Sequence, residues 1–188
     1  MTIPIPQRPS GFLIGDAAAK ITIDAFIDIQ CPHSRSIWPT LLEVSEYYKG
    51  KPVSLKVHLI TLSNHRQAWD MSLGLFALAE GDANKFYDFA TFVYERQSQF
   101  YNGSFLHKTH DDLLQLVADF ANQHSGIERN NFVQKMSDSD IYIQARTPMQ
   151  QQKLCGQHQH CLLIMRGMCL LITIQDWRIG KRLLNHYY

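Results

Sequence analysis

One segment of the chain combines residue types that suit thiol chemistry: Cys31-Pro32-His33-Ser34, preceded by Asp28. A cysteine at the start of a helix meets the unpaired N–H groups of the first turn, which favour the thiolate over the thiol. Pro32 suits the first helical position, because the N–H group that proline lacks has no partner there. His33 adds an imidazole that can carry positive charge or transfer a proton. The segment therefore predicts a reactive cysteine, and the alternative is a buried cysteine that only packs.

Two strands and one helix are predicted to hold this segment in place. Alternating apolar and polar residues predict a buried strand over 20–28 and a second strand over 52–62. Apolar residues at helical spacing predict a helix over 32–48, with Pro39 inside it as the source of a kink. A strand, a helix and a strand with short joins form a unit whose two strands run parallel. Cys31 is then expected where the first strand ends and the helix begins.

The middle of the chain carries helical periodicity. Apolar residues there predict helices around 69–77, 86–93 and 113–120, with a shorter one around 132–136 and another over 141–150. We therefore expect a single α/β domain over 1–188, with a helical insertion at about 65–150. His65 is expected to begin the first of these helices. His58 is expected to be an ordinary histidine of the sheet.

These features together resemble a known family. Gly15-Asp16-Ala17, the strand that follows and the Cys-Pro-His-Ser motif look like the opening of DsbA-like thioredoxin-fold proteins. Trp38-Pro39, Val57-His58-Leu59 and His65-Arg66-Gln67-Ala68 are similar to a eukaryotic DsbA-like branch that carries Cys-Pro-x-Ser. The resemblance covers residues 11–147. It implies a thioredoxin-like α/β fold with a helical insertion.

The motif departs from Cys-Pro-x-Cys at Ser34. A dithiol oxidoreductase releases its mixed disulfide by attack from the second cysteine, and a serine cannot make that attack. The resemblance therefore implies monothiol disulfide exchange or thiol transfer, with Cys31 as nucleophile, Pro32 and His33 tuning it, and Ser34 as a non-resolving partner. Asp28 is expected near Cys31, either as a proton acceptor or as a strand-end residue. The alternative is a non-catalytic thioredoxin-fold protein, either a binding protein or a vestigial one.

Composition limits the partners and the compartment. The 18 Lys and Arg residues against 17 Asp and Glu residues give a net charge of +1, which offers no footprint for nucleic acid or an anionic membrane. The expected partners are protein or small-molecule thiols and disulfides. No cofactor is predicted, and glutathione is considered only as a co-substrate. Four cysteines and an N-terminus unlike a signal peptide predict a reducing, cytoplasmic setting.

Residues 148–188 form an atypical C-terminal segment. Cys155, His158, His160 and Cys161 alternate on one short stretch, which disfavours tetrahedral closure, so no metal site is predicted.

The same segment lacks the Thr-Pro loop and following strand that a thioredoxin fold requires, because Thr147-Pro148 comes too early. Shifted by two bases, codons for Gly156 to Ile164 permit Thr-Pro-Thr-Leu-Phe-Ile-Asn. The resulting hypothesis is a frame error, a splice variant or a pseudogene-like lesion that starts near residue 147. The apolar run Leu162 to Ile174 is expected to be able to replace one strand of the sheet.

Overall fold

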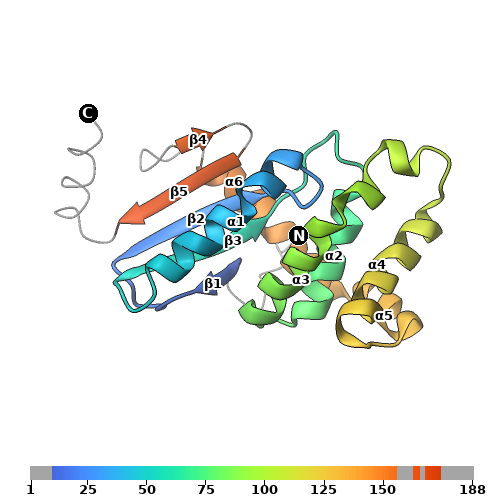
Figure 1. Ribbon diagram of the computed structural model, residues 1–188, viewed down its shortest axis with the longest axis horizontal. Helices are drawn as coiled ribbons and strands as arrows, with labels where there is room; N and C mark the ends of the chain where they lie inside the picture. The colour runs from blue at the N-terminus through green and yellow to red at the C-terminus, as the bar shows by residue number, and fades with distance from the viewer. Residues whose placement is uncertain (1–9, 156–162, 166–167, 175–188) are drawn as a thin grey trace, which may run out of the picture.

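A five-stranded sheet forms the centre of the molecule (Figure 1). The computed structural model describes residues 10–155, 163–165 and 168–174, with side chains for residues 10–149. The strands are β1 (Phe12–Ile14), β2 (Ile21–Ile27), β3 (Val53–Leu59), β4 (Leu163–Met165) and β5 (Met168–Ile174), in the order β1-β3-β2-β5-β4. β2 and β3 run parallel, as predicted, and the other pairs are antiparallel. β5 pairs with β2, so the apolar C-terminal run does supply a strand.

The helices follow the predicted order. They are α1 (Pro32–Tyr47), α2 (Ala68–Ala79), α3 (Ala83–Glu95), α4 (His110–Ser125), α5 (Arg129–Met136) and α6 (Ser139–Cys155), with short 3-10 helices η1 (Gln97–Phe100) and η2 (Gly103–Phe105). The prediction that His65 begins a helix is wrong, because Gln67 is the N-cap residue of α2. α6 continues through Thr147 and Pro148. β1 was not predicted, since three residues are too few to show alternation.

Alternation along β2 and β3 gives the sheet two covered faces. Ala25, Ile27 and Val57 belong to the large core that also holds Trp38 and Leu41 of α1. Phe26 belongs to a second, small cluster, where Met149 of α6 packs. Because successive side chains of a strand point to opposite faces, α1 and α6 cover opposite sides of the sheet. The start of α1 is thereby fixed at the carboxyl ends of the parallel strands.

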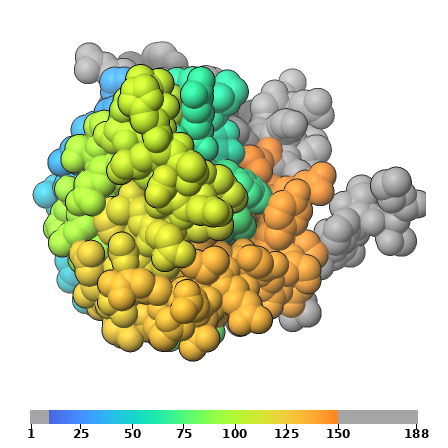
Figure 2. Space-filling view, turned by 90° about the vertical axis from the view of Figure 1, so that its right-hand side faces the viewer, coloured from blue at the N-terminus to red at the C-terminus, as the bar shows by residue number. Residues whose placement is uncertain are grey.

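Helices α2 to α5 pack together beside the sheet (Figure 1). Figure 2 looks onto this end of the molecule, where residues of α4 to α6 (yellow to orange) form much of the surface. Phe12 of β1 stacks on Phe86 of α3 with ring centroids 3.8 Å apart, which joins the helices to the sheet edge. Within the described residues, no helix is both long and apolar enough to cross a bilayer.

Candidate functional site

Cys31 lies directly before α1, as predicted. It is the N-cap residue of this helix, with an extended backbone (φ −74°, ψ 123°), and Pro32 occupies the first helical turn. The Cys31 carbonyl accepts the N–H of Arg35 at 3.0 Å, the first turn of the helix. The side chain is free of any disulfide and only 4% of the residue is exposed. Cys31 therefore lies at the N-terminal end of α1, where the helix dipole favours negative charge.

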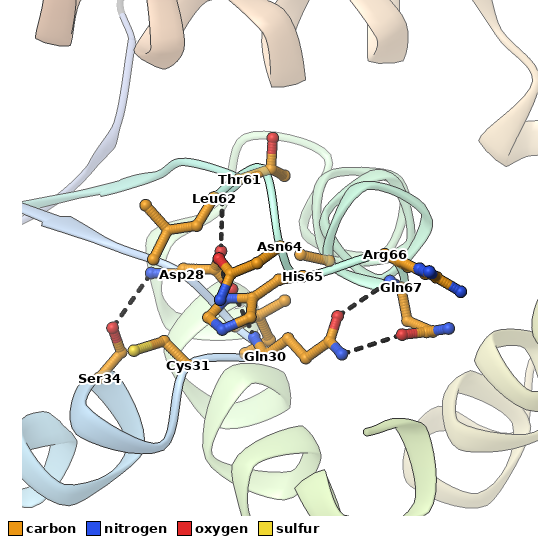
Figure 3. Close-up of polar contacts among 12 residues, drawn as sticks. Asp28, Gln30, Cys31, Ser34, Thr61, Leu62, Asn64, His65, Arg66 and Gln67 are labelled. Carbon is orange, nitrogen blue, oxygen red and sulfur yellow. Dashed lines mark hydrogen bonds and ion pairs between the residues drawn. The ribbon is translucent and has the colours of Figure 1, made fainter. Parts of the chain in front are cut away.

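Asp28 is the charged centre of the site (Figure 3). Its side chain is 1% exposed. One carboxylate oxygen accepts the N–H of Gln30 at 2.7 Å, and the other accepts the N–H of Leu62 at 2.7 Å. The second oxygen also lies 2.9 Å from Nδ1 of His65. These partners compensate for the burial of the charge and tie the end of β2 to the loop after β3.

Ser34 and Tyr94 close the space beside Cys31. The Ser34 hydroxyl accepts the Asp28 N–H at 3.2 Å, and the residue is 1% exposed. The Tyr94 hydroxyl donates to the Asp28 carbonyl at 3.3 Å. Burial raises the pKa of Tyr94 well above its ordinary value, negative charge on Asp28 and Cys31 raises it further, and a hydrogen bond with Ser34 opposes the shift. Tyr94 therefore remains a neutral donor beside the thiol.

A buried amide network supports the backbone of the site. Gln97 donates to the carbonyls of Ile29 at 2.9 Å and of Cys31 at 3.0 Å. Gln30 donates to Gln67 and to Asn102, at 2.9 and 3.0 Å. The sequence analysis missed Gln97, Gln67, Asn102, Tyr94 and the contact of His65. They lie 37 to 72 positions from their partners, and no local pattern in the sequence pairs them.

The structure brings together three of the five predicted site residues. Asp28, Cys31 and Ser34 form one buried group, whereas Pro32 and His33 are exposed on the first turn of α1. Within the described residues, no cluster of His, Cys, Asp and Glu could hold a metal ion. Residues 156–162 and the side chain of Cys155 lie outside the described part, so the cysteine–histidine stretch and the frame hypothesis remain predictions.

The arrangement defines a class of protein. A cysteine at the strand–helix junction of a parallel β-α-β unit, followed by helices before the last strands, is a thioredoxin-like α/β fold with a helical insertion. The family model described as thioredoxin matches residues 7–155, and the chain belongs to this family. The match ends at residue 155, inside the atypical C-terminal segment.

Solved structures of DsbA-like proteins share the fold. Oxidised BdbD from Bacillus subtilis has a TM-score of 0.64 at 13% identity, over 94% of this chain and 91% of its own. The α-DsbA1 protein of Wolbachia pipientis has a TM-score of 0.64 at 14% identity, over 92% and 79%. A periplasmic thioredoxin-like protein from Salmonella enterica serovar Typhimurium has a TM-score of 0.60 at 15% identity, over 96% and 91%. No curated protein matches the chain in sequence.

These neighbours correct one expectation. The sequence predicted a cytoplasmic setting from the cysteine count and from an N-terminus unlike a signal peptide. The Salmonella protein, which covers 96% of this chain, is periplasmic, and the neighbours as a group are DsbA-like. The cytoplasmic prediction is therefore wrong. The low number of cysteines was a poor guide to the compartment, because a fold with a large core does not depend on disulfides in any compartment.

Proposed function

We propose that the protein carries out thiol–disulfide exchange with Cys31 as its single nucleophile. The observation that carries the proposal is the place of the free Cys31 thiol at the N-cap of α1, in a chain of the thioredoxin family. A helix N-terminus stabilises a thiolate, and the thiolate is the species that attacks a disulfide. Pro32 begins the helix at this point, and His33 is an exposed residue of the first turn.

The exchange needs two partners, because Cys31 is the one cysteine in the part of the site whose side chains are described. The Cys31 thiolate attacks one sulfur of a disulfide, forms a mixed disulfide with it and releases the other sulfur as a thiolate. An external thiol then attacks the mixed disulfide and frees Cys31. Ser34 supports this scheme, since its hydroxyl is already used as the acceptor for the Asp28 N–H. We propose that the Cys-Pro-x-Ser motif is the one carried by the eukaryotic DsbA-like branch.

The partners proposed are protein thiols and disulfides, with glutathione as a small co-substrate. The likeness to oxidised BdbD and α-DsbA1 supports thiol partners, and the periplasmic Salmonella protein supports an extracytoplasmic, oxidising setting. In such a setting disulfide substrates are abundant. Glutathione fits the requirement for an external thiol that resolves the mixed disulfide.

One observation favours a second candidate function, a non-catalytic binding protein. Cys31 is 4% exposed and Ser34 is 1% exposed, so both side chains of the motif are almost wholly buried. A buried cysteine in apolar surroundings is commonly inert. The two candidates differ in the reactivity of Cys31 relative to an ordinary thiol.

The test is the trapping of a mixed disulfide on Cys31. The folded protein is incubated with glutathione disulfide, and the modified peptide is identified by mass spectrometry. A background variant with Cys155→Ser, Cys161→Ser and Cys169→Ser leaves Cys31 as the sole thiol. We expect rapid modification, its loss in Cys31→Ser, and release of the glutathione by an added thiol.

A gain-of-function variant sharpens the test. Ser34→Cys supplies a resolving sulfur, so the mixed disulfide is expected to give way to an intramolecular disulfide without added thiol. If Cys31 in the folded chain reacts no faster than the same cysteine in urea, the exchange proposal fails and the binding protein remains.

A further inference from the structure

The buried Asp28 carboxylate has one ionisable contact that reaches solvent. Among its partners, Gln30 and Leu62 contribute backbone N–H groups, which cannot change charge near neutral pH. His65 contributes Nδ1 at 2.9 Å, and its side chain is 13% exposed against 1% for Asp28 (Figure 3). Among the described residues that contact the carboxylate, His65 is therefore the one with an ionisable side chain.

The second ring nitrogen of His65 is open. Within the described residues, Nε2 of His65 has no hydrogen-bond partner, whereas both carboxylate oxygens of Asp28 are engaged. A proton can therefore enter or leave the pair at His65 without breaking a contact inside the protein. An ionised Asp28 with a neutral His65 carries a net negative charge, and protonation of His65 makes the pair neutral.

We propose that His65 acts through Asp28 as the positioning residue that sets the reactivity of Cys31. This role rests on the proposed exchange function, in which Cys31 is the nucleophile that the Asp28–His65 pair controls. Cys31 and Asp28 are close: the Cys31 N–H donates to the Asp28 carbonyl at 3.1 Å, and both groups act electrostatically on Tyr94. A net negative charge on Asp28 and His65 opposes ionisation of the Cys31 thiol. When the two residues together are neutral, that opposition is removed.

Few other charged groups share this space. Tyr94 from α3 faces the pair and stays neutral, because burial raises its pKa well above the ordinary value. Arg66 follows His65 and is exposed, and His33 is exposed on the first turn of α1. Solvent screens charges at such exposed positions more strongly than a buried pair. His65 is therefore the group whose protonation Cys31 should sense most.

The proton balance closes over one exchange. The Cys31 proton passes to solvent, and the neutral Asp28–His65 pair stabilises the thiolate that remains. The thiolate attacks a disulfide, and one S–S bond forms as another breaks. The leaving thiolate takes a proton from solvent. When an external thiol resolves the mixed disulfide, it loses one proton and the Cys31 thiolate is restored.

The experiment measures alkylation of Cys31 by iodoacetamide from about pH 5 to about pH 9 in the Cys155→Ser, Cys161→Ser, Cys169→Ser background. His65→Gln keeps a donor for Asp28 and removes the titration. We expect its alkylation rate near pH 6 to fall about tenfold, and the two rates to converge at the alkaline end. Adding Asp28→Asn to His65→Gln should restore the rate near pH 6, because no negative charge is then left beside the thiol.

A matched control lies outside the site. His110 forms a similar pair with Asp70, at 3.1 Å, and 65% of its side chain is exposed. His110→Gln should leave the profile unchanged. The proposal is overturned if His65→Gln folds with an unchanged profile, or if His33→Gln alone removes the pH dependence. Since alkylation needs no disulfide substrate, failure of mixed-disulfide trapping with an altered His65→Gln profile would remove the exchange function and leave this inference standing.

Discussion

Two aspartate–histidine pairs connect β2, or the residue just beyond its end, with β3 or the loop after β3, and they differ in which imidazole nitrogens have partners. Asp24, within β2, lies 2.8 Å from Nε2 of His58 on β3. Asp28, just beyond the end of β2, lies 2.9 Å from Nδ1 of His65. The first pair joins two neighbouring strands of the sheet, and the second lies beyond the end of β2, close to Cys31.

In the first pair, both ring nitrogens of His58 have partners. Nδ1 of His58 lies 3.1 Å from the Ser10 hydroxyl, and its ring stacks on Phe26 with centroids 4.6 Å apart. Gly11 (φ +82°) passes so close that a Cβ there would come within 2.7 Å of the His58 ring. His65 has no such enclosure. The comparison teaches that the same two residue types can form a contact that uses both imidazole nitrogens, as in His58, or one that leaves a nitrogen free within the described residues, as in His65.

The largest difference is expected between the two aspartates. Asp28→Asn places an amide NH₂ among three donors in a site that is 1% exposed. We expect it to lower the free energy of unfolding by about 3 kcal/mol, because the donors left without an acceptor are buried. Asp24 is 18% exposed, and Asp24→Asn should cost about 1 kcal/mol. Urea unfolding measures both, and equal losses would contradict the difference in burial.

The two histidines are expected to separate stability from reactivity. His58→Gln loses the stacking on Phe26 and one of its two hydrogen bonds, so the free energy of unfolding should fall by about 1 to 2 kcal/mol. The pH profile of Cys31 alkylation should not change, because the first pair lies inside the sheet. His65→Gln should show the reverse. A shifted profile in His58→Gln would show that both pairs act on Cys31.

The sequence allowed the main elements to be predicted, because the periodicity of β2, β3 and α1 is local. It also placed Cys31 at a helix start, since Pro32 marks the first turn. The closure of the site could not be predicted in the same way. His65 and Tyr94 reach Asp28 only after the loop beyond β3 and the helix α3 have packed, 37 and 66 positions along the chain.

The assignment of His65 shows the limit of local reasoning most clearly. Its neighbours Arg66, Gln67 and Ala68 read as the beginning of a helix, and α2 does begin at Ala68. The imidazole points back to Asp28, because a buried carboxylate is stabilised by a hydrogen-bond donor within reach. That energetic demand exists only in the folded molecule. His58, by contrast, was expected as an ordinary histidine of the sheet, and the structure confirms it.

The smallest effect is expected at an exposed carboxylate that serves as a reference for both pairs. Thr109 and Asp112 form a capping box at the start of α4. The pKa of Asp112 is lowered from its ordinary value, first by the Thr109 N–H and then by the Thr109 hydroxyl. A carboxyl group whose pKa is lower in the folded state stabilises the fold at pH values above its unfolded-state pKa. This contribution is lost as the pH falls through the folded-state pKa.

Thr109→Ala removes the hydroxyl from this box and should lower the free energy of unfolding by about 1 kcal/mol at neutral pH. The backbone contribution to Asp112 remains, so the loss should shrink as the pH falls below the ordinary carboxyl range and through the lowered pKa of Asp112. Urea unfolding at about pH 7 and about pH 3 measures the difference. Cys31 alkylation should be the same in both proteins, since the box is remote from the thiol. A change in alkylation would mean that loss of a remote carboxylate contact also alters Cys31. The effect of His65→Gln could then no longer be assigned to its contact with Asp28.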